Sequence, residues 1–189
     1  MTIAHVANKI FFEGRKGHKE SIEAIALLKK NGIHVNIKFA GAIVDNNSQK
    51  LMNYAEHLGV SSHVSFVGYI DRNQLDQFLT TADLFILPTK AEGLPRVLIE
   101  AMAKGLPCIS TRVSGNSELI GDEFLVSYND VAGLAEKISV FVSNKEVYEK
   151  ESERNFIKSL SYESSLLQQR RDEFYSQLKK SAELYVKAK

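Results

Sequence analysis

Short apolar runs alternate with segments of helical periodicity along most of this chain, and this alternation constrains its fold more than any other feature. The runs are four to six residues long, which suits strands, and each interval between them can hold a helix. Strands that alternate with helices are typical of a parallel sheet covered by helices. The sequence therefore predicts an α/β fold with C-terminal helices. The expected strands are residues 3–7, 35–40, 64–67, 84–87, the run containing Cys108, and residues 124–126.

Helical segments fill the intervals, and several carry start and stop signals. Asp71 is predicted to cap the N-terminus of a helix, and Asp130 directly precedes another. Gly32, Gly59 and Gly105 follow helical segments as C-terminal stops. The expected helices are the apolar stripe 22–28, residues 47–58, the segment after Asp71, residues 95–104, the segment after Asp130, and residues 145–160 and 161–189.

Length and charge exclude several classes of protein. The 189 residues suit a domain at 1–160 followed by an amphipathic helix at 161–189. Lys and Arg total 24 against 23 Asp and Glu, so the chain lacks the basic field that binds nucleic acid. The single Cys108 cannot form a disulfide or a cysteine-based metal site within one chain. Because neither a signal peptide nor an apolar span of about 20 residues is recognisable, we expect a cytoplasmic protein.

The loop after Leu87 is a candidate site, because ligands of open parallel sheets bind beyond the carboxyl ends of the strands. Pro95 suits the first turn of the helix that follows, and Gly93 lets the backbone approach a ligand closely. The free N–H groups of this turn are therefore expected to bind an anion such as a diphosphate.

Two carboxylates accompany that turn, Glu92 just before the helix and Glu100 in its middle. The helix is nearly apolar on every side, which predicts burial all round, and a buried carboxylate needs a partner. Glu100 is expected either to pair with Arg96 one turn earlier or to accept hydrogen bonds from a ligand diol such as a ribose. Glu92 is either a solvated loop residue or a group that meets sugar hydroxyls.

A second unusual loop, residues 8–18, follows the first expected strand. It carries three cations, Lys9, Arg15 and Lys16, and two glycines, which suits phosphate oxygens, although a solvated charged loop is the alternative. The glycines match neither the dinucleotide fingerprint nor the P-loop. His18 is interpreted as a helix-start residue rather than a ligand or base. No metal site is assigned, because metal-ligand spacing is missing around the other histidines, His5, His34, His57 and His63.

Five short motifs are found along the chain: Lys16-Gly17-His18, Phe66-Val67-Gly68-Tyr69, Leu87-Pro88, Glu92-Gly93 and Glu100-Ala101-Met102. Together they resemble the C-terminal, donor nucleotide-sugar-binding domain of GT-B glycosyltransferases, in particular the retaining family 4 type, group 1. The resemblance extends from about His5 to Ser161. Its most specific part is the E-x7-E motif from Glu92 to Glu100, followed by Ala-Met-Ala-x-Gly-x-Pro. It implies a single three-layer, Rossmann-like domain.

The resemblance also implies roles for individual residues. In that family the first motif glutamate approaches the donor sugar and the second binds the ribose, which implies Glu92 and Glu100 here. The backbone after the first glutamate contacts sugar and diphosphate, and the base pocket follows the strand that ends in Gly-Tyr. The residues implied by these two features are Gly93, Leu94, Tyr69 and Ile70.

Two cations hold the diphosphate in the family, normally as Gly-Arg and then Lys-Gly. Lys16 matches the second of them. The first corresponds to Asn8-Lys9, but the loop that follows is longer here, so Arg15 is an alternative to Lys9.

The implied reaction transfers a sugar from a nucleotide diphosphate sugar with retention of configuration. Lys16 and Glu92 would be its catalytic residues, and no bound metal or other cofactor is expected, because cations and a helix N-terminus stabilise the leaving diphosphate. UDP-, GDP- and ADP-sugars all remain candidate donors, because base contacts in this fold are largely to backbone. The family places the acceptor on an N-terminal domain, so an acceptor-binding domain or subunit is the expected partner. Polysaccharide assembly in the cytoplasm, with peripheral contact at the inner face of the plasma membrane, would follow.

Two other functions compete with this interpretation. One is a nucleotide-sugar-binding module without catalysis, and the other is a sugar-nucleotide epimerase, which would need catalytic carboxylates and histidines from two domains. The last helix adds a further question, because its stripe is expected to pack on its own domain, on a missing domain or on a membrane surface. The residues of this stripe are Leu167, Phe174, Leu178 and Tyr185.

Overall fold

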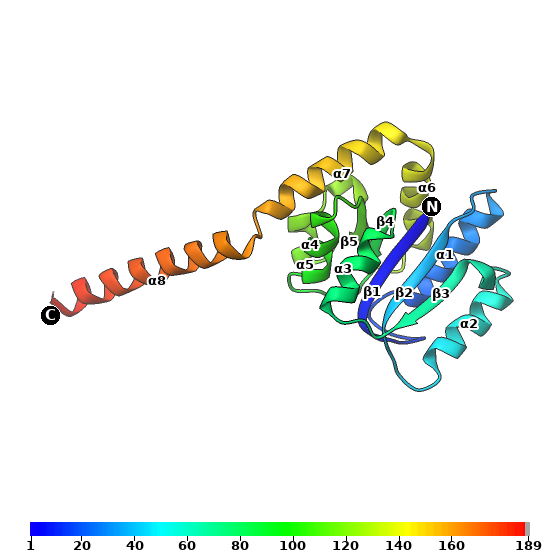
Figure 1. Ribbon diagram of the computed structural model, residues 1–189, viewed down its shortest axis with the longest axis horizontal. Coiled ribbons are helices and arrows are strands. Elements are labelled where there is room, and N and C mark those ends of the chain that lie inside the picture. The colour runs from blue at the N-terminus through cyan, green and yellow to red at the C-terminus, as the bar shows by residue number, and fades with distance from the viewer. Residues whose placement is uncertain (188–189) are drawn as a thin grey trace.

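The structure is a computed structural model that describes residues 1–187, with side chains through residue 182. Within these residues, six parallel strands form one sheet in the order β3-β2-β1-β4-β5-β6 (Figure 1). The strands are β1 (Thr2–Ile10), β2 (Asn36–Ile43), β3 (Val64–Gly68), β4 (Leu84–Leu87), β5 (Cys108–Thr111) and β6 (Leu125–Val126). The α-helices are α1 (His18–Lys30), α2 (Asn47–His57), α3 (Arg72–Thr80), α4 (Arg96–Ala103), α5 (Ser114–Leu119), α6 (Val131–Ser143), α7 (Lys145–Leu160) and α8 (Ser164–Lys187). Two short 3-10 turns, η1 (Ser61–His63) and η2 (Asp122–Phe124), precede β3 and β6.

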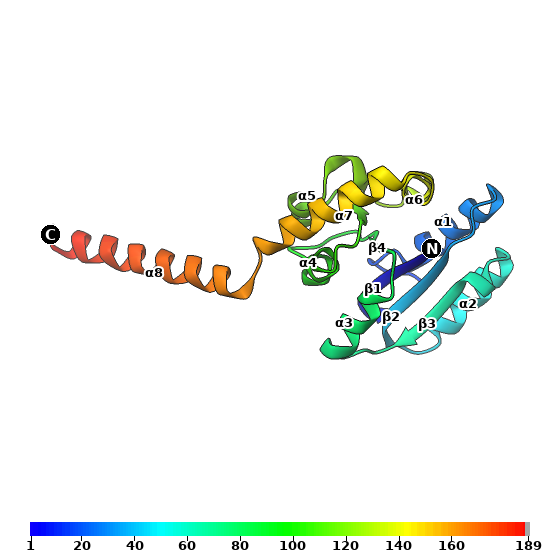
Figure 2. The same ribbon diagram turned by 45° about the horizontal axis from the view of Figure 1, so that its top comes forward.

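Helices cover both faces of the sheet, as right-handed crossovers require when the strand order reverses near the middle. α1 packs against α2 and α6 on one face, α3, α4 and α5 lie on the other, and α7 packs against α4 (Figures 1 and 2). The predicted three-layer α/β architecture is confirmed.

The β4 strand shows why the apolar runs become strands. All four of its residues are buried, because β1 and β5 flank it and helices cover both faces. Burying a side chain of this size contributes about 1.5–3 kcal/mol. The predicted helix caps are also present: Asp71 accepts a hydrogen bond from the Gln74 N–H at 2.8 Å, and Asp130 accepts one from the Gly133 N–H at 2.8 Å.

Two parts of the sequence-based description are wrong. The first strand continues to Ile10, so Lys9 lies in β1, paired with Ala42 of β2, and not in a loop. The α4 helix is not buried all round, since Arg96 is exposed and Glu100 is half-buried. Its apolar residues instead form one buried face of Leu98, Ala101 and Met102.

The α5 helix is absent from the sequence-based prediction, because Ser114-Gly115-Asn116-Ser117 has the composition of a turn. A small helix forms there because Gly115 and Asn116 are buried and Asn116 bonds to β5.

The α8 helix extends away from the body of the molecule (Figures 1 and 2). Its predicted stripe is exposed at Leu167, Phe174 and Leu178, so the stripe does not pack on its own domain there. The side chain of Tyr185 lies outside the described side chains. Docking of α8 on another domain or on a membrane stays a prediction.

Candidate functional site

The strand order reverses its direction at one position of the sheet, between β1 and β4. From β1 the chain proceeds outward to β2 and β3, whereas β4, β5 and β6 follow one another in the opposite direction. β1 and β4 are therefore adjacent strands whose connections diverge, and such a switch point opens a crevice beyond the strands' carboxyl ends. The two unusual loops of the sequence, residues 11–17 and 88–95, both begin there.

These two loops are hydrogen-bonded to each other at the Arg15 carbonyl. The Arg15 carbonyl accepts hydrogen bonds from the Thr89 hydroxyl at 2.9 Å and from the Lys90 N–H at 2.7 Å. Gly17 has a left-handed φ of 70°, and a Cβ there would lie 2.1 Å from the Pro88 carbonyl oxygen. Only glycine allows this approach, which brings the start of α1 against the second loop.

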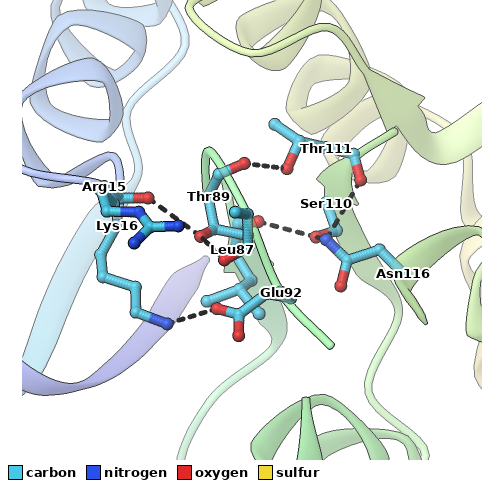
Figure 3. Close-up of polar contacts among 9 residues, drawn as sticks. Arg15, Lys16, Leu87, Thr89, Glu92, Ser110, Thr111 and Asn116 are labelled. Carbon is cyan, nitrogen blue, oxygen red and sulfur yellow. Dashed lines mark hydrogen bonds and ion pairs between the residues drawn. The ribbon is translucent and has the colours of Figure 1, made fainter. Parts of the chain in front are cut away.

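An open pocket of about 290 Å³ lies between the loops, lined by Arg15, Lys16, Ala91, Glu92 and Gly93. Lys16 Nζ forms an ion pair with the Glu92 carboxylate across it (Figure 3). The Arg15 guanidinium makes no hydrogen bond or ion pair within residues 1–187. The pocket therefore presents one unpaired cation, one cation held by a carboxylate, and that carboxylate.

Backbone donors add to the pocket's capacity for anions. Within the described chain, the N–H groups of Glu92, Gly93 and Leu94 donate no hydrogen bond, and the loop ends at the N-terminus of α4. Gly93 is exposed and Leu94 is 44% exposed. Free N–H groups at a helix N-terminus favour phosphate and other anions.

A buried polar framework supports the pocket from behind (Figure 3). The Ser110 hydroxyl donates to the Leu87 carbonyl at 2.7 Å, and the Thr111 hydroxyl donates to the Thr89 carbonyl. The Asn116 amide donates to the Ser110 hydroxyl at 2.8 Å and to the Thr111 carbonyl at 3.1 Å. These bonds hold the end of β4 to β5 and α5, and so fix where the second loop starts.

The α5 helix contacts that loop from the far side. A Cβ on Gly115 would lie 1.7 Å from the Gly93 carbonyl oxygen, so the two backbones are in direct contact. Asn116 is fully buried, and its Oδ1 has no hydrogen-bond partner among the residues described. The backbone of Gly93 is thereby held between the pocket and α5.

Two buried histidines lie under the first loop. The rings of His5 and His18 stack with centroids 4.7 Å apart and planes 4° from parallel, and both pack against Phe39. Burial, then His18 and Lys16, lower the pKa of His5 well below its usual 6.5. Burial and, less strongly, Lys16 lower the pKa of His18 to about 4. Both rings are therefore neutral at pH 7.

The His5–His18 pair is connected to the backbone of the first loop through Ser21. His5 Nδ1 lies 3.2 Å from the Ser21 hydroxyl, which donates to the Gly17 carbonyl at 2.7 Å. His18 is the first residue of α1, as predicted, and its burial makes it part of the packing beneath Gly17.

The other predicted site residues lie outside this pocket's lining. Glu100 projects from α4 and is half-buried. Within residues 1–187 it forms neither the ion pair with Arg96 that was one of its two expected roles nor any other ion pair or side-chain hydrogen bond. Lys9 is exposed near the end of β1. Tyr69, 74% exposed, and Ile70, half-buried, follow β3, which β2 separates from β1.

A second depression, of about 670 Å³, is lined by the ends of α1 and α2. These helix ends lie at the amino-terminal edge of the strands, away from the switch point. In this depression Lys29 Nζ donates a hydrogen bond to the Gly59 carbonyl at 2.6 Å, so this ammonium group is already bonded within the protein. It has no converging polar groups and is a poor ligand site.

Residues 1–187 contain no group of three or more His, Cys, Asp or Glu side chains placed to hold a metal ion. None of the helices described is long and apolar enough to cross a membrane.

Sequence reasoning missed the framework and the ion pair. Thr89 closely follows the apolar run that forms β4, and Ser110 and Thr111 are the last two residues of β5, so hydroxyl residues at the ends of apolar runs were the available signal. The Lys16–Glu92 pair joins residues 76 positions apart, which no local pattern reveals.

Comparison with known protein families identifies one matching model. The family described as glycosyl transferases group 1 matches residues 10–159. Protein CapJ of Staphylococcus aureus is 32% identical over 139 residues, which cover 73% of this chain and 35% of CapJ. The matched segment spans about a third of the length of the curated relatives.

Solved structures share the fold. The Anabaena protein HepE in complex with UDP superimposes with a TM-score of 0.82 at 21% identity, covering 93% of this chain and 48% of HepE. The C-terminal domain of LpcC, a glycosyl transferase group 1 family protein from Francisella tularensis, has a TM-score of 0.74 at 22% identity and covers 85% of this chain and 84% of that domain. At these identities the similarity establishes the fold alone.

Proposed function

Because the chain belongs to the glycosyl transferases group 1 family, we propose that it is the donor-binding, C-terminal domain of a retaining glycosyltransferase. The observation that carries the proposal is the pocket at the switch point, where Arg15, Lys16, Glu92 and free backbone N–H groups converge. Two cations and unpaired N–H groups suit a diphosphate, and a carboxylate beside them suits sugar hydroxyls.

The proposed donor is a nucleotide diphosphate sugar. HepE, a relative in fold, has been solved in complex with UDP and with UDP-glucose. In this chain Arg15 and Lys16 would neutralise the diphosphate, the Gly93 and Leu94 N–H groups would bind its oxygens, and Glu92 would accept hydrogen bonds from the sugar. Glu100 has no protein partner among the described residues, which leaves its carboxylate available to a ribose diol. Tyr69 and Ile70 would flank the base, and Lys9, exposed in β1, is the weaker candidate for a diphosphate contact.

The chemical contribution of this domain is stabilisation of the leaving group. In the transfer, the bond from sugar C1 to the diphosphate oxygen breaks with its electron pair staying on the diphosphate. The acceptor's hydroxyl oxygen bonds to C1, and its proton passes to the departing diphosphate. Fixed cations and N–H groups stabilise the negative charge that develops on the diphosphate, because they are in place before the reaction begins. This role requires no bound metal.

The acceptor is proposed to bind elsewhere. The pocket is open to solvent, and the matched region covers 48% of the HepE chain. An N-terminal acceptor-binding domain or subunit would complete the site. A nucleotide-sugar-binding module without catalysis is the second candidate, and transfer or donor hydrolysis upon adding such a partner would exclude it.

Calorimetric titration of the purified chain with UDP, GDP and ADP tests the proposal. One nucleotide should bind selectively, and Glu100→Ala should weaken that binding by about 1–3 kcal/mol, the usual range for hydrogen bonds to a charged group. Glu56→Ala, which removes an exposed carboxylate from α2, is the matched control and should leave binding unchanged. Equal binding by wild type and Glu100→Ala would contradict the ribose role.

A further inference from the structure

The ion pair between Lys16 and Glu92 occupies the groups that the donor would use. Lys16 Nζ contacts the Glu92 carboxylate, and the two side chains are only 32% and 15% exposed. Neither side chain has another hydrogen-bond or ion-pair partner among the residues described. A carboxylate this poorly hydrated depends on its cation, because losing the partner of a shielded charge costs more than losing one in open water.

The backbones on either side of this pair cannot move apart easily. Arg15 accepts two hydrogen bonds from the second loop, Gly17 touches Pro88, and Gly93 touches Gly115. A ligand that needs Lys16 must therefore take it by a side-chain movement, while Glu92 stays where it is.

We propose that Glu92 is a specificity-determining residue that makes the pocket bind a nucleotide sugar in preference to the bare nucleoside diphosphate. The inference rests on the proposed function and extends it to the discrimination between donor and spent product. Both ligands bring a diphosphate that draws Lys16 away from Glu92. Only the sugar brings hydroxyl donors that satisfy the carboxylate left behind.

Two effects therefore weaken the binding of the bare diphosphate. It leaves Glu92 without a partner, and it places negative charge beside that carboxylate. Once the sugar has been transferred, the Lys16–Glu92 pair can form again at the expense of the phosphate contacts, which favours release of the product. Specificity of this kind comes from a cost imposed on the wrong ligand rather than from added contacts to the right one.

The test is a set of titrations in which Glu92 loses its charge. Glu92→Gln should bind the nucleoside diphosphate about three- to tenfold more tightly than wild type, because Lys16 is released and the repulsion is gone. The probes are UDP, GDP and ADP, and the affected one is whichever the wild type binds. Uridine, guanosine and adenosine carry no phosphate and should show no gain.

Further variants separate the effect of the ion pair from other effects of charge. Glu13→Gln removes an exposed carboxylate of the same loop region and should change the affinity less than twofold. In a Lys16→Met background, Glu92→Gln should also gain less than twofold, because no cation is left to be released. Glu92→Ser repeats the charge removal with a smaller side chain, and its melting temperature and that of Glu92→Gln establish that both variants are folded.

The outcomes separate the two proposals. If the wild type binds a nucleoside diphosphate and folded Glu92→Gln and Glu92→Ser bind it equally or more weakly, the discrimination by Glu92 is overturned and the donor-binding function stands. If the wild type binds none of the three diphosphates, the proposed function itself fails. A gain that persists in the Lys16→Met background would also overturn the inference, because the ion pair would not be its cause.

Discussion

The charged side chains that line the pocket, Arg15, Lys16 and Glu92, differ from the framework behind them in the partners of their polar groups. In the pocket, the Arg15 guanidinium has no partner among the described residues and Lys16 is bonded only to Glu92. In the framework, Thr89, Ser110 and Thr111 are fully buried, and each of their hydroxyls donates to a main-chain carbonyl. Ligand recognition and rigidity therefore depend on separate residues. Changes in the framework should reduce stability, and changes in the pocket should alter binding with little effect on stability.

The largest loss of stability is expected from Gly17→Ala, at the contact between the two loops. The substitution forces a left-handed alanine and places its Cβ 2.1 Å from the Pro88 carbonyl oxygen, so we expect it to lower the free energy of unfolding by about 4 kcal/mol. Gly59→Ala is the matched control, since Gly59 has a φ of 71° but nothing within 4 Å of its added Cβ. It should cost only about 1 kcal/mol. Equal losses in urea denaturation would show that the two loops are not in tight contact.

The buried histidine pair should make stability depend on pH. A histidine whose pKa is lowered by folding binds its proton more readily in the unfolded chain, so stability is complete above pH 6.5 and is lost as the pH falls toward 4. For His18 alone the loss is about 3 kcal/mol. His18→Phe keeps a flat ring without a titrating group, and the decline between pH 6.5 and 4 should shrink by about that amount. An unchanged decline in denaturation curves would mean that His18 is not buried.

The smallest framework effect is expected from Asn116→Ala. It removes the amide that donates to Ser110 and Thr111, at a cost of about 2 kcal/mol in unfolding free energy. Asn73→Ala, on the exposed side of α3, is the control and should change stability by less than about 0.5 kcal/mol. If both variants unfold at the same denaturant concentration, the α5 attachment contributes nothing.

The sequence predicted the fold well because periodicity and burial coincide. Runs such as Leu84–Leu87 are apolar at every position and become strands covered on both faces. Helix starts at Asp71 and Asp130 follow from local hydrogen bonds that the residue type itself supplies. The α5 helix was not predictable in this way, since a polar, glycine-containing segment becomes helical only through its contacts with β5 and the second loop.

The candidate site was predicted in part. Arg15, Lys16, Glu92 and Gly93 were singled out from their loops, and the structure brings them to one pocket. The strand containing Lys9 proved longer than its apolar run, because pairing with β2 resumes at Lys9 and Ile10 after a register shift that follows Val6. The burial expected for Glu100 was overestimated, because an apolar composition does not distinguish a helix packed on one face from one packed all round.

Amide chemical-shift mapping would show whether the pocket between the two loops binds a nucleoside diphosphate. A ¹⁵N-labelled chain would be titrated with UDP, GDP and ADP while the backbone N–H signals are followed. We expect one nucleotide to produce its largest shifts at Lys16, Glu92, Gly93 and Leu94, with no change at Gly59. Shifts confined to the depression around Leu27 and Gly59, or no shifts with any of the three nucleotides, would contradict it.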